Sequence, residues 1–315
     1  MTFINPVSIE KLLRAGSNMD AYLKEVKKEV SVAGTKAVVH FYLINFDGNQ
    51  SPRVADLAEF LSFRLLDYCI PRDEIQRAKE EDLKNNSSVQ ITKLGKKAKL
   101  LLTDLEKTGE GGELMLYALA QEYLKMPQLL CKMPLKTSSQ MHVHGVDGVH
   151  VKFDPGSGCL AIYWGESKMH QTFGSAVDDC FESVGKFLSN TGGSGTQFQR
   201  ELQLMISNID LLDNDLEEAI LTYLDKDHVN YTKAKNCAVC LVAFDYKRYP
   251  LGPNQTQLQD LLAEAIKKVD KWIKRVGTSL VAKAPLHTYD IELFIVPFPS
   301  VDGFRQSFLE ELGLK

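Results

Sequence analysis

Three ionisable residues, Asp147, Glu166 and Lys168, have the types and the spacing that phosphate-ester chemistry requires. Glu166 and Lys168 are separated by one residue at the end of a short apolar stretch, and Asp147 lies upstream of that stretch. Two carboxylates and an ammonium that converge can hold a divalent metal ion beside a phosphodiester, because hard ions prefer oxygen ligands. The residues therefore indicate hydrolysis of a phosphate ester as a candidate activity.

A predicted β-hairpin brings the two carboxylates together. Residues 143–153 and 159–165 are extended in character, and the Asp-Pro-Gly-Ser-Gly sequence at 154–158 is a strong turn signal. Asp147 and Glu166 lie about equally far from the centre of this turn, so we expect their side chains to face each other, with Cβ atoms roughly 5 Å apart. Two carboxylates that close repel, and the arrangement needs a cation or a proton.

The strand before Glu166 bears on whether these charges are functional. A hairpin end decorated with solvated charges is the alternative interpretation of the same residues. Residues 160–164 are apolar on both faces, however, which is typical of a central, buried strand. Alternation of side chains places Lys168 on the same face as Glu166. Charges at the end of a buried strand are costly, which favours a functional role.

Glu113 is a fourth candidate, at the start of a predicted helix over residues 113–124. On a helical wheel it lies with Tyr117, Ala120 and Leu124, so it leans toward the packed face and could reach a site there. The alternative is a glutamate in the first turn that is stabilised by the helix N-terminus.

Composition sets limits on the class of protein. The chain has 315 residues, of which 44% are hydrophobic and 25% charged, as in soluble globular proteins. No apolar run approaches the roughly 20 residues that span a bilayer, and the N-terminus lacks the features of a signal peptide. Six scattered cysteines favour a reducing cytoplasm. The net charge of −4 excludes a global basic field, so a nucleic acid would be met by local patches or through another subunit.

The pattern of elements predicts an α/β fold: a mixed central β-sheet flanked by helices on both sides. Strands are expected over residues 36–46, 143–153, 159–165, 237–245 and 291–297. Helices are expected over residues 8–30, 54–68, 72–83, 94–106, 113–124, 173–188, 197–212, 216–224, 258–276 and 302–312. We predict one domain over residues 1–315, with 1–88 as an N-terminal α/β extension and 89–315 as the catalytic core and C-terminal elements.

Histidines and cysteines offer further candidates. Zinc could be bound by a group of histidines, although no cysteine or carboxylate with zinc spacing surrounds them, and a histidine that lines the phosphate-ester site is the other interpretation; the residues are His142, His144, His150 and His170. Cys237 and Cys240 have redox or metal spacing, but they lie inside an apolar strand without a second pair, which favours buried structural cysteines.

Four short segments resemble the PD-(D/E)xK nuclease superfamily. They are Gly111-Gly112-Glu113-Leu114 at the start of a helix, Lys132-Met133-Pro134-Leu135-Lys136-Thr137, Gly145-Val146-Asp147-Gly148-Val149-His150 and Gly165-Glu166-Ser167-Lys168. More narrowly, most of the chain resembles the HamA family, the nuclease-like subunit of the Hachiman antiphage defence system, and residues 56–61, 67–75 and 294–298 add to this resemblance. Asp147 is preceded by Gly-Val and not by the proline of the superfamily name.

The resemblance implies a restriction-endonuclease-like fold and a Mg²⁺-dependent deoxyribonuclease. Asp147, Glu166, Glu113 and the backbone carbonyl of Ser167 would bind Mg²⁺ or Mn²⁺, and Lys168 would orient or help to deprotonate the attacking water. The implied partners are DNA and a helicase subunit of the same system, in the cytoplasm and without a membrane. A catalytically silent subunit that binds DNA or scaffolds the helicase is the alternative, and a small-molecule phosphatase is a third possibility.

Overall fold

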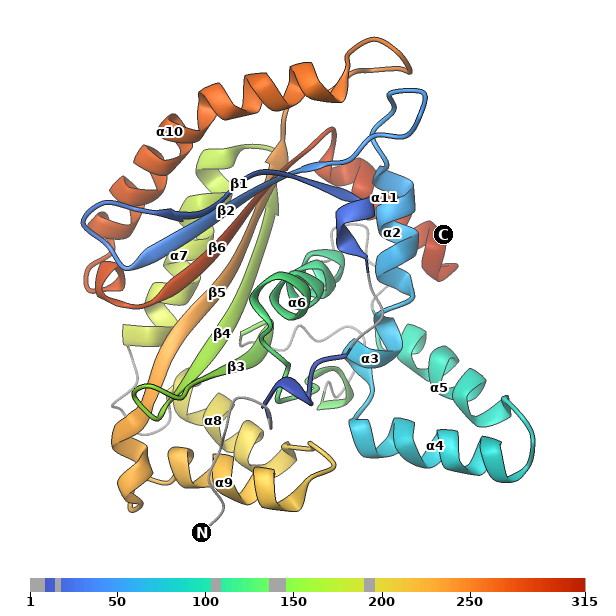
Figure 1. The fold of residues 1–315 in the computed structure, drawn as a ribbon, viewed down its shortest axis with the longest axis vertical. Coiled ribbons are helices and arrows are strands. Elements are labelled where there is room, and N and C mark those ends of the chain that lie inside the picture. Colours follow the sequence, from blue (N-terminus) through green and yellow to red (C-terminus); the bar gives the residue numbers. More distant parts are fainter. Residues whose placement is uncertain (1–8, 15–17, 103–108, 136–145, 190–195, 315) are drawn as a thin grey trace.

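A six-stranded mixed β-sheet forms the centre of the molecule (Figure 1). The computed structural model describes residues 9–14, 18–102, 109–135, 146–189 and 196–314. The strands are β1 (Leu23–Ser31), β2 (Ala37–Ile44), β3 (Gly148–Asp154), β4 (Cys159–His170), β5 (Ala234–Asp245) and β6 (Ile291–Phe298). Their order is β1-β2-β6-β5-β4-β3, with antiparallel pairs at the two ends and parallel pairs between β2, β6, β5 and β4. The predicted α/β class with a mixed sheet is confirmed.

Helices cover both faces of the sheet, as predicted (Figure 1). On one face lie α7 (Phe173–Ser189) and α10 (Leu258–Ala282), where Phe187 and Trp272 pack on Trp164 and Phe41 of the sheet. On the other face lies α6 (Glu110–Leu124), next to α2 (Val54–Ser62) and α11 (Val301–Leu312). The remaining helices are α3 (Leu65–Cys69), α4 (Arg72–Lys84), α5 (Val89–Leu100), α8 (Gln197–Asn208) and α9 (Asn214–Leu224), with 3-10 turns at Met19–Ala21, Met133–Leu135, Val229–Lys233 and Leu286–Thr288. None of the helices in the described residues has both the length and the apolar character of a membrane span.

The predicted helix over residues 8–30 is wrong, because residues 23–31 form the edge strand β1. Its side chains are mostly exposed, and only Leu23 is buried. Lysines and glutamates are good helix formers, so a strand rich in them looks helical in sequence. On an edge strand the same charges prevent pairing with other chains. Pairing with β2, which no local pattern reveals, decides the conformation.

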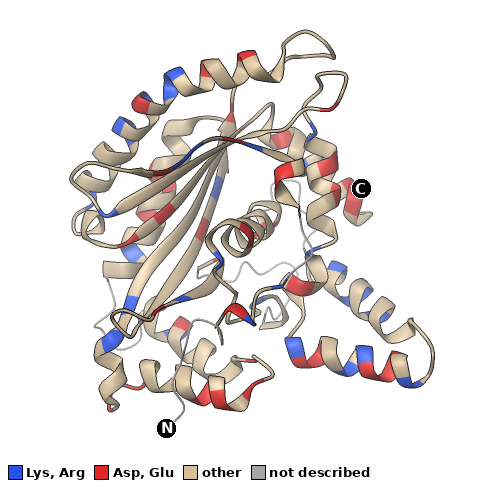
Figure 2. Cartoon of the chain, viewed as in Figure 1, with Lys and Arg blue, Asp and Glu red and all other residues tan. Residues whose placement is uncertain are grey.

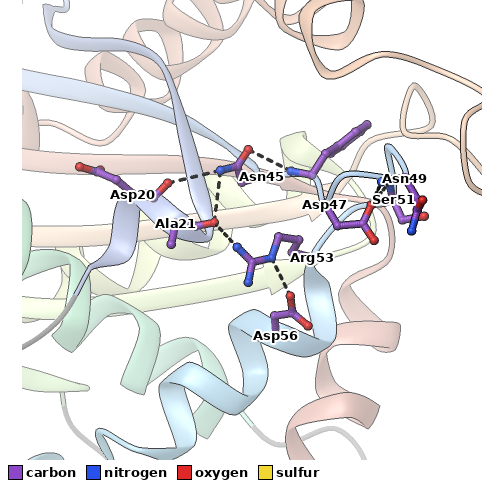
Figure 3. A network of polar contacts seen from close by, with 9 residues as sticks. Asp20, Ala21, Asn45, Asp47, Asn49, Ser51, Arg53 and Asp56 are labelled. Atoms are coloured by element: carbon purple, nitrogen blue, oxygen red, sulfur yellow. Dashed lines mark hydrogen bonds and ion pairs between the residues drawn. The ribbon is translucent and has the colours of Figure 1, made fainter.

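A polar network joins the turn before β1 to the segment between β2 and α2 (Figure 3). Arg53 donates to the carbonyl of Ala21 at 2.8 Å and to the Asp56 carboxylate at 2.6 Å, and its guanidinium lies over the Tyr22 ring. Asn45 also donates to the Ala21 carbonyl, at 3.2 Å.

Since β2 pairs directly with β6, the described strands of residues 1–88 are part of the same sheet as β3 to β6.

The hairpin of β3 and β4 has the register that its turn predicts. Gly148 pairs with Gly165, and Asp154 pairs with Cys159 at the turn. A Cβ atom on Gly165 would lie only 3.2 Å from the backbone nitrogen and oxygen of Gly148, and 3.4 Å from a methyl group of Leu116 on α6. The two strands and α6 therefore meet too closely at this point for a side chain.

Replacement of Gly165 by alanine is expected to lower the free energy of unfolding by about 1–3 kcal/mol, because backbone atoms of the partner strand must shift. Gly174→Ala in α7 is the matched control: nothing lies within 4 Å of its added Cβ, and the change is expected to be neutral or to stabilise by up to about 1 kcal/mol. Urea unfolding followed by circular dichroism measures both. Equal stability of the two variants would contradict the close approach.

Candidate active site

Asp147 lies one residue before β3, and the ladder of the hairpin places it opposite Glu166. The register of Gly148 with Gly165, continued by one residue, gives this pair. The Asp147 N–H donates to the Gly165 carbonyl at 2.8 Å, which extends the ladder past the end of the strand. The Ser167 N–H in turn donates to the Asp147 carboxylate at 2.6 Å. The carboxylate of Asp147 is thus fixed by the backbone of β4.

Glu166 and Lys168 lie on the face of the sheet that α7 covers. Their side chains form an ion pair, and Glu166 is 4% exposed while the Lys168 side chain is 31% exposed. Ser183 of α7 also hydrogen-bonds to Glu166. The alternation of side chains that predicted a shared face for Glu166 and Lys168 is confirmed, and Lys168 extends from the buried carboxylate toward solvent.

The electrostatics of the cluster show two carboxylates in competition. Burial, and after it the charge of Asp147, raise the pKa of Glu166 to about 7 against the opposing effect of Lys168. Burial also raises the pKa of Asp147, against the opposing effects of Lys168, the Ser167 N–H and Lys132. Burial lowers the pKa of Lys168, but the Glu166 and Asp147 charges more than offset this, so its pKa is raised. Near neutral pH the Lys168 ammonium alone does not balance the two buried carboxylates. A bound cation would supply the missing positive charge.

Glu113 approaches from the opposite face, on the first turn of α6. The α6 N-terminus packs closely on β4, because a Cβ atom on Gly112 would lie 3.1 Å from the Ser167 hydroxyl. The Tyr68 hydroxyl donates to the Glu113 carboxylate at 3.1 Å and lies 3.4 Å from the Asp147 carbonyl oxygen. The structure therefore brings Asp147, Glu166 and Lys168 together and connects Glu113 to Asp147 through Tyr68.

A metal ion at this cluster would need ligands beyond its two carboxylates. Among the residues that the structure describes, no group of three or more histidine, cysteine, aspartate or glutamate side chains is placed to hold a metal ion. Magnesium is often held by only one or two carboxylates, with water and substrate phosphates as further ligands. The oxygen donors of Asp147 and Glu166, and their shortage of positive charge, fit such an ion. That the Ser167 carbonyl and Glu113 are further ligands remains a prediction from the sequence.

Two residues that contact this site were not among the predicted site residues. Tyr68 is buried, and burial and the nearby Glu113 raise its pKa well above its usual range, so it stays a hydroxyl donor. The ammonium of Lys132 contacts the carbonyl of Val146, the residue before Asp147. Tyr68 follows an amphipathic helix and looks like core, and Lys132 lies in an irregular segment. Tyr68 lies in a segment that resembles the HamA family and Lys132 in one that resembles the PD-(D/E)xK superfamily, which is the signal that could have found them.

The other predicted ligands, where they are described, are buried or have partners outside the cluster of Asp147, Glu166 and Lys168. His150 is buried, burial lowers its pKa to about 4, and its Nδ1 lies 3.1 Å from the Met126 carbonyl oxygen. His170 lies 3.3 Å from the Asp179 carboxylate on α7. Cys237 and Cys240 are both buried within β5. His142 and His144 lie outside the described residues.

Comparison with known proteins gives one family. The family model described as HamA matches residues 20–312, which is nearly the whole chain. A comparison with the curated proteins finds no match.

The raised pKa of Glu166 predicts that stability falls with pH when divalent ions are absent. Between its ordinary pKa of 4.5 and about 7, the folded protein holds a proton that the unfolded chain releases. Raising the pH through this range should therefore remove stability on the order of 3 kcal/mol. Glu166→Gln should lack this part of the slope, as urea unfolding at pH 5, 6, 7 and 8 would show. Parallel pH profiles for the two proteins would contradict the assignment.

Proposed function

The chain belongs to the HamA family, whose members are subunits of the Hachiman antiphage defence system, and within that system we propose that it is a metal-dependent DNA endonuclease of the PD-(D/E)xK type. The observation that carries the proposal is the convergence of Asp147, Glu166 and Lys168 at the end of one hairpin. The order along the chain adds support. Helix α6, with Glu113 in its first turn, comes first; Asp147 and β3 follow, and then β4 with Glu166 and Lys168.

Each residue of the cluster has a role that its contacts support. Asp147 and Glu166 would hold Mg²⁺ or Mn²⁺, and the Ser167 N–H keeps the Asp147 carboxylate in place. The ion, when bound, would polarise the phosphoryl oxygen and supply a nucleophile near neutral pH. With an ion on Glu166, the Lys168 ammonium would be left to orient the attacking water and to neutralise charge on the phosphate. Glu113 would assist through a second ion or a bound water, and the Tyr68 hydroxyl connects it to Asp147.

We propose DNA and a helicase subunit as the partners. Figure 2 shows acidic and basic residues interspersed along α4 and α10, and the net charge is −4. A phosphate backbone is attracted by clustered positive charge, so a chain of this kind gains little from long-range attraction. A helicase subunit that already holds DNA would present the strand to the cluster, and would account for a nuclease without a basic field.

A catalytically silent subunit is the second candidate function. It is favoured by the lack of a group of three potential metal ligands among the described residues. In that case the nuclease-like fold would bind DNA or scaffold the helicase, and the ion pair of Lys168 with Glu166 would be structural.

Glu166→Gln and Lys168→Met are each expected to reduce Mg²⁺-dependent cleavage of plasmid DNA about 100-fold or more, since the first removes a charge that would hold the ion and the second removes a charge that would stabilise the reacting phosphate. Chelation of divalent ions with EDTA should abolish cleavage by the unaltered protein. Lys152→Ala, an exposed lysine at the middle of β3, is the matched control and should cleave normally. Agarose gels that resolve supercoiled, nicked and linear plasmid measure the rates.

Three assays separate the alternatives: plasmid cleavage, protection of cells from phage, and release of phosphate from nucleotides. Full cleavage by Glu166→Gln and Lys168→Met would overturn the proposed site. A protein that protects cells from phage equally well with and without these two substitutions would favour the silent subunit. Release of phosphate from nucleotides, without cleavage of polymers, would favour a small-molecule phosphatase.

A further inference from the structure

Lys132 is a buried lysine with two partners, and both lie close to the hairpin end. Its side chain is 7% exposed. Its ammonium contacts the Val146 carbonyl oxygen and lies 2.9 Å from the Glu201 carboxylate on α8, which is 2% exposed. Three segments thus meet at one ammonium: residues 126–135, the chain just before β3, and the more distant α8.

Stability alone is a weak reason for this pair. Two charges lose their hydration when they are buried, and apolar residues of similar volume often stabilise a protein as well or better. Apolar side chains of the same helix, Phe198, Leu202 and Met205, are also buried, so the surroundings suit an apolar pair. The contact that an apolar pair cannot replace is the one to the Val146 carbonyl, because that oxygen requires a donor.

The Val146 carbonyl belongs to the peptide group that joins Val146 to Asp147. The N–H of the same peptide group donates to Gly165 on β4. One side of this peptide is therefore held by the partner strand and the other by Lys132. Asp147 precedes the first residue of β3, so the ladder with β4 restrains only the N–H side of this peptide group. The carbonyl side depends on Lys132.

We propose that Lys132 is a positioning residue for Asp147: held by Glu201, it fixes the peptide before Asp147 and with it the direction of the Asp147 carboxylate. The proposal rests on the proposed function, because the carboxylate needs a fixed place only if it binds an ion for cleavage. A misplacement of about 1 Å in a reacting group can cost about 100-fold in rate.

The decisive variant is Lys132→Met/Glu201→Met. Lys132→Met alone leaves a buried, unpaired carboxylate and is expected to unfold easily, whereas the double variant removes both charges. We expect the double variant to melt within a few degrees of the unaltered protein, yet to cleave DNA about 10- to 100-fold more slowly at saturating Mg²⁺, with the loss in kcat. Lys132→Arg, which keeps a buried donor and a charge, should recover part of the rate. Glu264→Gln/Lys267→Gln on α10, which removes an exposed ion pair, is the control and should cleave normally.

A readout that needs no cleavage separates this proposal from the proposed function. Hydrogen exchange of the peptide that contains residues 146–151 should be faster in the folded double variant than in the unaltered protein, because the Asp147 amide loses its support. An unaltered protein that does not cleave DNA counts against the nuclease, and faster exchange still supports the restraint. A folded double variant with normal exchange, or with normal cleavage, would overturn the proposal and leave Lys132 and Glu201 as a structural pair.

Discussion

The carboxylates of Asp147 and Glu166 oppose each other at the end of one hairpin, and the rest of the site depends on how the protein tolerates that pair. Burial and mutual repulsion raise the pKa of Glu166 to about 7, even though Lys168 forms an ion pair with it. This arrangement does not favour stability, because apolar residues at these positions would carry no desolvation cost. This electrostatic cost is the physical reason for proposing that the cluster holds a cation.

Close packing of the backbone makes the pair possible. Gly165 lets β3, β4 and α6 meet directly before Glu166, and Gly112 lets the first turn of α6 rest on Ser167. The side chains of β4 then divide between two layers: Glu166 and Lys168 face α7, whereas Ser167 faces α6. The candidate site thus lies within β4, next to the start of β3, and its residues are approached from both faces of the sheet.

The features that sequence could predict are the local ones. The hairpin register follows from the turn at residues 154–158 and from strand alternation, both of which act over a few residues, and the structure has that register. Strand β1 was mistaken for a helix because its conformation depends on pairing with β2 and not on its own lysines and glutamates. Tyr68 and Lys132 were not identified from local patterns because their contacts join segments that are distant in sequence, and no local periodicity marks them.

The division between local and distant contacts bears on regulation. Asp147, Glu166 and Lys168 all belong to the hairpin or directly precede it, so one short stretch of sequence carries the proposed site. The contacts that support Asp147 come from elsewhere in the chain. Tyr68 of α3 contacts its carbonyl, and Lys132, paired with Glu201 of α8, contacts the carbonyl of the residue before it. If Lys132 positions Asp147, a displacement of α8 would draw Glu201 away and release the peptide before the carboxylate. A partner subunit that moves α8 could then act on the site without contact to any residue that touches DNA, which is a way to restrain a nuclease while its substrate is already bound.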